Sequence, residues 1–229
     1  MINAITTVGK VLKALLAPDF CFYCRDYLWD TNRLNNSYAS RDFICASCVL
    51  FIKPVISKVL SFPNGQTSHI YAVSAYEDPL LPLVLAKEWS DYTASKQLAR
   101  LMYDFSILKK SSYDYIVPVP AHWTRIADRG YNQTAVMAQE LGRLMALPVI
   151  NALDRIKRTP QQRGSSAVKR RQNVKDAFLL TDAASKVVGC RVLLIDDVMT
   201  TGATVFECTE ELFQTKPCEI ATLVACRVV

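Results

Sequence analysis

Residues 192–204 read Val-Leu-Leu-Ile-Asp-Asp-Val-Met-Thr-Thr-Gly-Ala-Thr, and this stretch decides the fold. Its first four residues form an uninterrupted apolar run, which is typical of a strand covered on both faces. Two adjacent carboxylates follow, then a short loop that is rich in hydroxyl groups, then a predicted helix over residues 204–213. A strand, a polar loop and a helix in succession form the unit of an α/β sheet, whose ligands bind beyond the carboxyl ends of the strands.

The residue types of this loop suit a sugar phosphate. Backbone N–H groups at a helix N-terminus bind phosphate with help from the helix dipole, and Gly202 lets the backbone come close. Asp196 and Asp197 are acceptors placed to hold vicinal hydroxyls, so the combination describes a ribose 5-phosphate. The alternative is that two aspartates merely end a strand and start a helix. Neither G-x-x-x-x-G-K-[ST] nor G-x-G-x-x-G occurs, which excludes a P-loop and a dinucleotide fingerprint.

Strand and helix patterns alternate on both sides of this stretch. Strands are predicted over residues 70–75, 115–119, 192–195 and 220–225. Amphipathic helices are predicted around Leu98 to Leu108 and after Asn132, a residue that can cap the second helix. This alternation predicts an α/β fold with a mainly parallel sheet and helices on both faces.

A turn cluster at residues 61–65 is a plausible boundary between two parts of the chain. We therefore expect an N-terminal module over residues 1–62 and a larger α/β domain over residues 63–229. The module is expected to begin with an amphipathic helix over residues 2–16.

The composition excludes several classes of protein. The chain has 229 residues, of which 51% are hydrophobic and 21% are charged, so it is not a disordered chain. No stretch reaches the roughly 18 consecutive apolar residues that a membrane span needs. The N-terminus lacks a small-residue cleavage site and is a poor signal peptide. We expect a soluble protein inside the cell.

Four of the eight cysteines, Cys21, Cys24, Cys45 and Cys48, form two C-x2-C pairs with twenty residues between them. This spacing indicates a structural tetrahedral zinc site, and four thiolates leave no open position for a catalytic water. Two disulfides or a redox pair are the alternatives. The other cysteines lie in apolar segments without ligand spacing, and we expect them to be small core residues: Cys190, Cys208, Cys218 and Cys226.

The net charge of +6 comes from one segment. Residues 155–175 carry eight basic side chains and no acid, so the remaining residues have a net charge of −2. This basic segment is either a solvated loop or a surface for the phosphates of a nucleotide or a nucleic acid. A long basic segment without clear secondary structure is also what a closing lid would look like.

Residues 192–204 resemble the phosphoribosyl pyrophosphate (PRPP) motif of type I phosphoribosyltransferases at every position. The resemblance implies a type I phosphoribosyltransferase-like sheet, with Asp196 and Asp197 on the ribose 2′- and 3′-hydroxyls. It implies that residues 200–204 wrap the 5-phosphate. The expected PRPP-binding residues are Asp196, Asp197, Val198, Met199, Thr200, Thr201, Gly202, Ala203, Thr204 and Lys87.

Further elements resemble the ComF family. Pro118-Val-Pro and Arg129-Gly-Tyr-Asn-Gln match its PVP and RGxNQ elements, and the four-cysteine ribbon is also a ComF feature. The segments that start at Arg158 and Arg170 match its R-T-x-x-Q and R-x-x-N-V-x-x-A-F patterns. Lys87 stands where the family usually has a lysine, but Glu88 follows where an aromatic residue and a glycine are usual. The resemblance implies a bacterial, cytoplasmic protein linked to natural competence, the uptake of single-stranded DNA.

Two functions from different classes follow. The first is a Mg²⁺-dependent phosphoribosyltransferase with an unknown acceptor. Its catalytic candidates are Asp196, Asp197 and Arg129. His122 is a further candidate, and the alternative for it is a surface histidine without a role in catalysis. The second is a non-catalytic protein that binds single-stranded DNA or acts as a scaffold among competence-machinery proteins. The basic residues expected to contact pyrophosphate or nucleic acid, with two amides, are Arg158, Gln162, Arg163, Lys169, Arg170, Arg171 and Asn173.

Overall fold

The computed structural model describes residues 20–28, 42–53, 55–88, 92–110, 113–158 and 172–228. The chain divides into two compact units, residues 1–51 and 52–229. The helix predicted over residues 2–16 lies outside the described residues. Within the described ranges, no helix combines the length and the apolar character that crossing a membrane requires.

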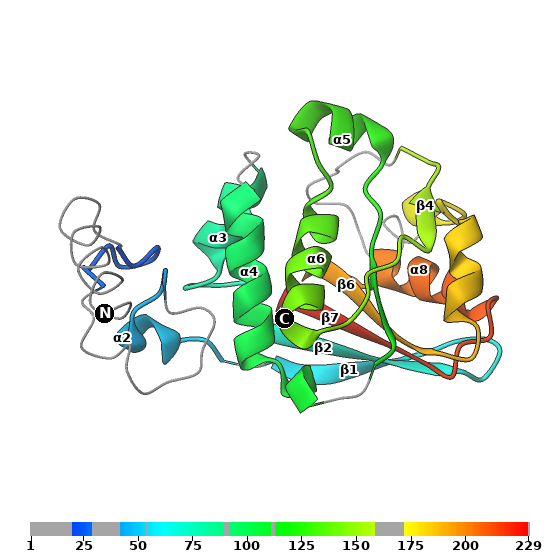
Figure 1. The fold of residues 1–229 in the computed structure, drawn as a ribbon, viewed down its shortest axis with the longest axis horizontal. Helices are drawn as coiled ribbons and strands as arrows, with labels where there is room; N and C mark the ends of the chain where they lie inside the picture. The colour runs from blue at the N-terminus through cyan, green and yellow to red at the C-terminus, as the bar shows by residue number, and fades with distance from the viewer. Residues whose placement is uncertain are drawn as a thin grey trace, which may run out of the picture. The chain divides into compact units, whose positions relative to one another are not determined.

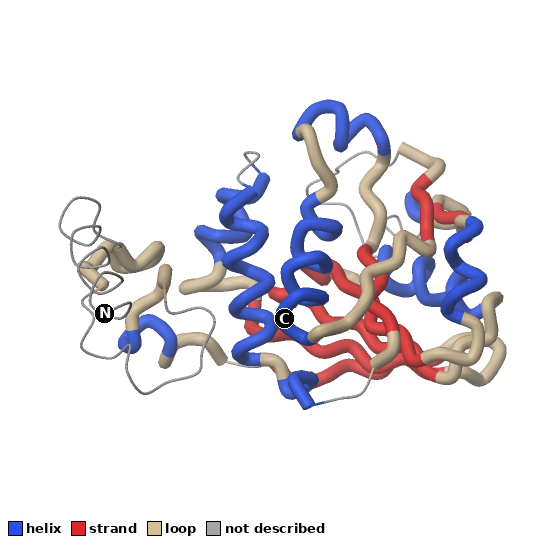
Figure 2. The backbone as a smooth tube through the Cα atoms, viewed as in Figure 1, coloured by secondary structure: helices blue, strands red, loops and turns tan. Residues whose placement is uncertain are grey.

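The second unit is built on a five-stranded sheet, drawn as the lower group of red segments in Figure 2, apart from the small red hairpin. The strands, in the spatial order of the sheet, are β1 (Val55–Ser61), β2 (Thr67–Ala75), β7 (Glu219–Arg227), β6 (Arg191–Met199) and β3 (Tyr115–Pro118). β1 and β2 are antiparallel, and the other neighbouring pairs are parallel. The expected mainly parallel α/β sheet is therefore confirmed.

Residues 192–195 of β6 are buried on both faces of the strand, which is why they are all apolar. Val192 and Leu194 pack in a core that also contains residues of helix α8 (Ala203–Phe213), while Leu193 and Ile195 are equally buried on the other side. Successive side chains of a strand point to opposite faces, so no polar residue is tolerated until the strand reaches the end of its covered part.

The helices lie on both faces of this sheet (Figure 1). Helices α3 (Leu81–Glu88), α4 (Tyr92–Phe105) and α6 (Gln133–Met145) pack together, and α4 and α6 contact the sheet. α8 packs on β6 and against a two-stranded hairpin of β4 (Leu153–Arg155) and β5 (Phe178–Leu180). Short helices complete the unit: η2 (Ile107–Lys110), α5 (Trp123–Arg129) and η3 (Asp182–Val187).

β1 differs from the sequence prediction, which assigned its residues to the N-terminal module. The turn at residues 62–66 joins β1 to β2 as a hairpin, and Phe62 donates from its backbone N–H to Gln66 O at 3.0 Å. Leu60 and Phe62 are buried in the core of the larger unit, where the Phe62 ring stacks on Phe206 at 4.6 Å. The apolar side chains therefore hold this segment in the sheet, and the turn is not a boundary between units.

Candidate functional site

The carboxyl ends of β3 and β6 lie at the topological switch point of the sheet. α6, which follows β3, packs on the face that carries α4, whereas α8, which follows β6, packs with the β4–β5 hairpin. The β3–β6 ladder ends where Pro118 pairs with Ile195, but β6 stays paired with β7 as far as Met199. Ligands of open α/β sheets bind in the crevice that forms at such a point.

The two adjacent aspartates stand where β6 has lost β3 as a neighbour. Asp196 is buried, at 8% exposure, and Asp197 is half-buried. Asp196 Oδ1 accepts the N–H of Asp197 at 2.9 Å, which fixes the orientation of the first carboxylate. The sequence predicted that both carboxylates face solvent or a ligand. Asp196 has little exposure to solvent, because β6 continues past it, paired with β7.

The loop after β6 ends at the N-terminus of α8. Gly202 is the N-cap, with φ of 80°, a left-handed conformation that favours glycine. No side chain caps this helix, and Phe206 N–H donates to Gly202 O at 2.8 Å as the first helical bond. Thr201 Oγ1 accepts the N–H of Ala203 at 3.4 Å, so the loop residues predicted to wrap a phosphate surround the first turn. The positive end of the α8 dipole therefore follows the aspartates after one short loop.

On the other side of the switch point is the chain that leaves β3. Val119 N–H donates to Ile195 O at 2.9 Å, and Val119 O accepts Thr134 Oγ1–H. Asn132 caps α6 as predicted, because its Oδ1 accepts the N–H of Thr134 at 3.2 Å. The Arg-Gly-Tyr-Asn-Gln element therefore ties the end of β3 to the start of α6.

The β4–β5 hairpin brings both ends of the basic segment together. Arg155 pairs with Phe178 in the hairpin, and Ile156 N–H donates to Ala177 O at 2.9 Å. One step further out, Lys157 Nζ donates to Lys175 O at 3.2 Å. The described ends of the basic segment therefore leave the sheet domain and return to it at the same place.

Arg155 is the site residue that sequence reasoning missed. Its guanidinium lies over the Phe178 ring, 5.3 Å from the centroid. Burial lowers the pKa of Arg155, the nearby charge of Arg125 lowers it further, and the charge of Asp196 opposes both. The base of the basic segment therefore puts a partly buried positive charge within electrostatic range of the first aspartate. Only the charge of Arg155 was visible in the sequence, since a three-residue strand carries almost no periodicity.

The other predicted contacts are placed unevenly. Arg158 is exposed and Asn173 is partly buried. They lie at the two described ends of the basic segment. The structure describes only the backbone of Lys87, near the end of α3, and of Arg129, the last residue of α5. Four predicted basic residues and one amide lie outside the described residues: Gln162, Arg163, Lys169, Arg170 and Arg171.

His122 is not the surface histidine that the sequence suggested. It is 5% exposed and is the N-cap of α5, because its Nδ1 accepts the N–H of Thr124 at 3.3 Å. Its ring also contacts Trp123, with centroids 5.6 Å apart. The imidazole has a structural role at the helix start, a position for which the common capping residues gave no signal.

The first unit contains the predicted four-cysteine cluster. The sulfur atoms of Cys21, Cys24, Cys45 and Cys48 lie within 4.8 Å of one another. Cys24 Sγ and Cys45 Sγ are 3.7 Å apart, and a tetrahedral metal with bonds of about 2.3 Å separates its sulfur ligands by about 3.8 Å. Burial raises the pKa of Cys48 and the neighbouring thiols raise it further, so a cation is needed before all four can be thiolates. The donor set fits a tetrahedral metal such as zinc.

Two short elements hold this cluster. Cys45 is the N-cap of α2 (Ala46–Val49), and its Sγ accepts the N–H of Cys48 at 3.4 Å. Phe22 N–H donates to Phe43 O at 2.8 Å and joins the two C-x2-C segments. Among the described residues of this unit few apolar side chains are buried, so a metal bound to the cluster would add to its stability.

The remaining cysteines fulfil the core prediction in part. Cys208 and Cys226 are fully buried, but Cys190 is partly exposed and Cys218 is exposed. The last two lie at strand starts, where the sheet meets solvent.

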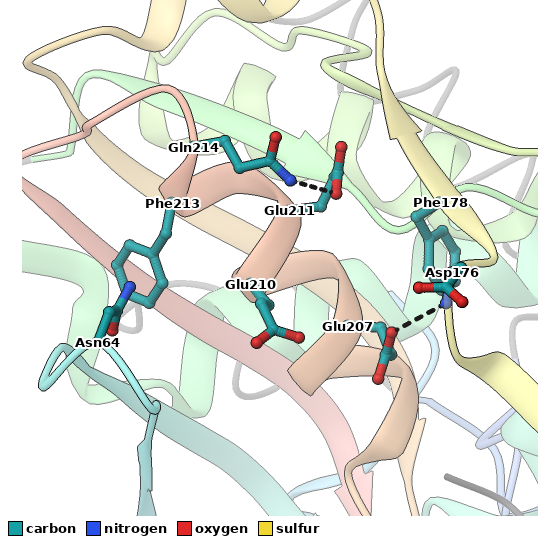
Figure 3. Close-up of a pocket in the computed structure, with 8 residues that line it drawn as sticks. All are labelled: Asn64, Asp176, Phe178, Glu207, Glu210, Glu211, Phe213 and Gln214. Carbon is teal, nitrogen blue, oxygen red and sulfur yellow. Dashed lines mark hydrogen bonds between the residues drawn. The ribbon is translucent and has the colours of Figure 1, made fainter. Parts of the chain in front are cut away.

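A separate cavity of about 470 Å³ lies along α8, beyond the loop that contains Gly202 (Figure 3). Its lining residues are Asn64, Asp176, Phe178, Glu207, Glu210, Glu211, Phe213 and Gln214. Burial raises the pKa of Glu207, and the charges of Glu210 and Asp176 raise it too. A cavity lined by four carboxyl groups repels phosphate, so it is not a second site for the same ligand.

The chain is similar to curated bacterial proteins over most of its length. It is 37% identical over 221 residues to competence protein F of Haemophilus influenzae, covering 84% of this chain and 90% of that protein. It is 29% identical over 232 residues to DNA utilization protein YhgH of Salmonella typhimurium, covering 93% and 99% of the two chains. It is 30% identical over 165 residues to YhgH of Escherichia coli K12, covering 69% and 71%.

Solved structures give weaker likenesses. Glutamine PRPP amidotransferase from B. subtilis is 16% identical with a TM-score of 0.41, covering 58% of this chain and 26% of that one. Adenine phosphoribosyltransferase from Saccharomyces cerevisiae is 12% identical with a TM-score of 0.41, covering 80% and 90%. Scores this low carry no inference on function. No family model matches the chain.

Proposed function

Since the chain belongs to the competence protein F family, we propose that it binds PRPP in the β3–β6 crevice and serves DNA uptake as a cytoplasmic competence protein. The observation that carries the proposal is the aspartate pair beside the glycine-headed N-terminus of α8 at the switch point. A carboxylate pair and a phosphate-binding helix end, one loop apart, suit a ribose 5-phosphate.

Within this proposal the half-buried Asp197 accepts hydrogen bonds from the ribose hydroxyls. Asp196 completes the pair, and Arg155 and the Asp197 N–H hold it in place. The N–H groups at the start of α8 and the threonine hydroxyls bind the 5-phosphate, since Gly202 leaves their approach open. Mg²⁺ bound with PRPP would neutralise pyrophosphate charge.

The same site supports phosphoribosyl transfer to an acceptor that the sequence does not identify. In that reaction the bond from ribose C1 to pyrophosphate breaks through an oxocarbenium-like state, so the leaving group needs positive charge and water must be excluded. Lys87, Arg129 and the basic segment supply the positive charge. The segment would close over the site as a lid, and the hairpin, in which its described ends meet, supports this.

We also propose that the cysteine cluster holds one structural zinc ion. Its four sulfur atoms support this through their spacing and through their number, which fills a tetrahedral zinc. The metal would stabilise the first unit and take no part in chemistry.

Titration with PRPP and Mg²⁺ tests the ligand. Asp197→Asn should weaken PRPP binding about tenfold or more, because a charge-assisted hydrogen bond contributes about 1.5–3 kcal/mol. Asp182→Asn, an exposed aspartate at the start of η3, is the matched control and should bind as the wild type does. Unchanged affinity in the folded Asp197→Asn protein would refute the site. Turnover against a panel of nucleobases then separates a transferase from a PRPP-binding protein.

A second candidate function is binding of single-stranded DNA without catalysis, and the eight basic residues of the segment favour it. Each phosphate contacted gives a log–log salt slope of about −0.7 on a single strand. Replacing Arg170 and Arg171 with alanine should therefore flatten the slope by about 1.4. Lys53 and Lys186, both exposed, provide the matched double variant, whose slope should not change. A basic-segment variant with the wild-type slope would leave that segment without a role in DNA binding.

A further inference from the structure

Two cysteines stand side by side at the amino ends of adjacent parallel strands. β6 and β7 pair in register from Arg191 and Glu219, and Cys190 and Cys218 are the residues just before them. The backbone N–H of Cys218 donates to Cys190 O at 2.9 Å, so the ladder extends to the cysteines. Neighbouring strands lie about 4.8 Å apart, which is inside the Cα separation of about 4.4–6.8 Å that a disulfide requires.

The two thiols also point to the same place. The Cys218 thiol donates to Gly189 O at 2.9 Å, and the Cys190 thiol donates to Val188 O at 3.5 Å. Val188 and Gly189 are consecutive residues of the turn between η3 and β6. Side chains of register partners leave a sheet on the same face, so rotation of the two side chains brings the sulfur atoms toward each other.

Solvent reaches this pair and not the other cysteines of the unit. Cys218 is exposed and Cys190 is partly exposed, whereas Cys208 and Cys226 are fully buried. Thiol chemistry depends on access, so a reagent that leaves the fold intact meets the first two. The pair lies at the amino ends of the strands, and the aspartates stand toward the carboxyl end of β6.

We propose that Cys190 and Cys218 are a redox site that exchanges with low-molecular-weight disulfides such as oxidised glutathione. One thiolate attacks a glutathione sulfur, which forms a mixed disulfide and releases one reduced glutathione. The second thiolate attacks the protein sulfur of that mixed disulfide, which forms the Cys190–Cys218 bond and releases the second reduced glutathione. The protein loses two electrons and two protons, and the oxidant gains them. The site is independent of the PRPP proposal.

The bond would tie together the starts of the two strands that α8 connects. A closed loop restricts the unfolded chain more than the folded one, so the oxidised protein should melt at a higher temperature. Because the aspartates lie farther along β6, PRPP affinity should be the same in both redox states.

Full-length protein equilibrated with defined ratios of oxidised to reduced glutathione tests the proposal. After the remaining thiols are alkylated, peptide fragmentation should identify a Cys190–Cys218 link. Cys190→Ala and Cys218→Ala should instead each carry glutathione on the remaining thiol. Wild-type protein that carries glutathione on both residues, or that keeps both thiols reduced at ratios that modify the single variants, overturns the proposal. A link to a cysteine of the four-cysteine cluster overturns it too.

Discussion

Replacing Glu140 with glutamine should lower the stability of the second unit by about 2 kcal/mol at pH 7. Glu140 lies on α6, and its side chain is 7% exposed between Arg100 of α4 and Arg143 of its own helix. Its Oε1 accepts Arg100 Nε–H and Arg143 Nη2–H, both at 2.9 Å. This clasp joins α4 to α6, whose N-terminus is hydrogen-bonded to the chain that leaves β3.

The magnitude follows from the carboxyl pKa. The hydrogen bonds from Arg143 lower it, burial opposes them, and Arg100 lowers it further, so it falls from 4.5 to about 2. At about 1.4 kcal/mol for each tenfold change, this shift sets an upper limit of about 3 kcal/mol. Solvent screens the mostly exposed Arg143, which reduces the expected loss to about 2 kcal/mol.

The pH dependence provides the decisive comparison. A carboxylate with a lowered folded pKa stabilises the protein fully above its unfolded pKa, and this stabilisation is lost as pH falls from about 4.5 toward 2. Urea unfolding followed by circular dichroism should therefore show a gap between wild type and Glu140→Gln that is largest at pH 7 and about half as large at pH 3. Glu77→Gln, at an exposed position, is the control. Equal gaps at the two pH values, or no gap at pH 7, would refute the reasoning.

Two further predictions concern the metal and the acidic cavity. Cys45→Ser should abolish zinc binding, which elemental mass spectrometry should measure as one zinc ion per wild-type chain. PRPP binding should be unchanged, because the two units are separately compact. Wild-type protein that is purified without chelator and contains no zinc would contradict this prediction. Glu207→Gln should raise the melting temperature at pH 7 and leave it nearly unchanged near pH 4, because burial raises the pKa of Glu207 and only its charged form is penalised. A lower melting temperature at pH 7 would mean that the hydrogen bond from Asp176 N–H outweighs burial.

The parts of the fold that the sequence predicted are those with a local cause. β6, the loop at Gly202 and α8 follow from an apolar run, a glycine and helical periodicity, all within one short stretch. The Asn132 cap is also local, since the side chain bonds a backbone group two residues on. The four-cysteine cluster follows from spacing alone, because each C-x2-C brings two sulfur atoms to one point.

The parts that the sequence did not predict depend on distant partners. β1 is a strand of the sheet because its apolar end packs in the core that contains α8. The sequence predicted a boundary between units at the turn that joins β1 and β2. That turn separates two apolar runs, which is a hairpin signal that could have identified it. The β4–β5 hairpin has three-residue strands on either side of a long insertion, so no window of sequence contains both.

The burial of Asp196 changes what a substitution there can reveal. Its charge opposes the lowering of the Arg155 pKa, and that guanidinium is itself partly buried on Phe178. Removing the carboxylate leaves a buried positive charge without one of its neighbours, so loss of ligand and loss of stability would come together. The half-buried Asp197 does not carry this ambiguity to the same degree. The sequence presents the two aspartates as equivalent, but in the fold the first is buried near the charge of Arg155 and the second is the better probe of the ligand.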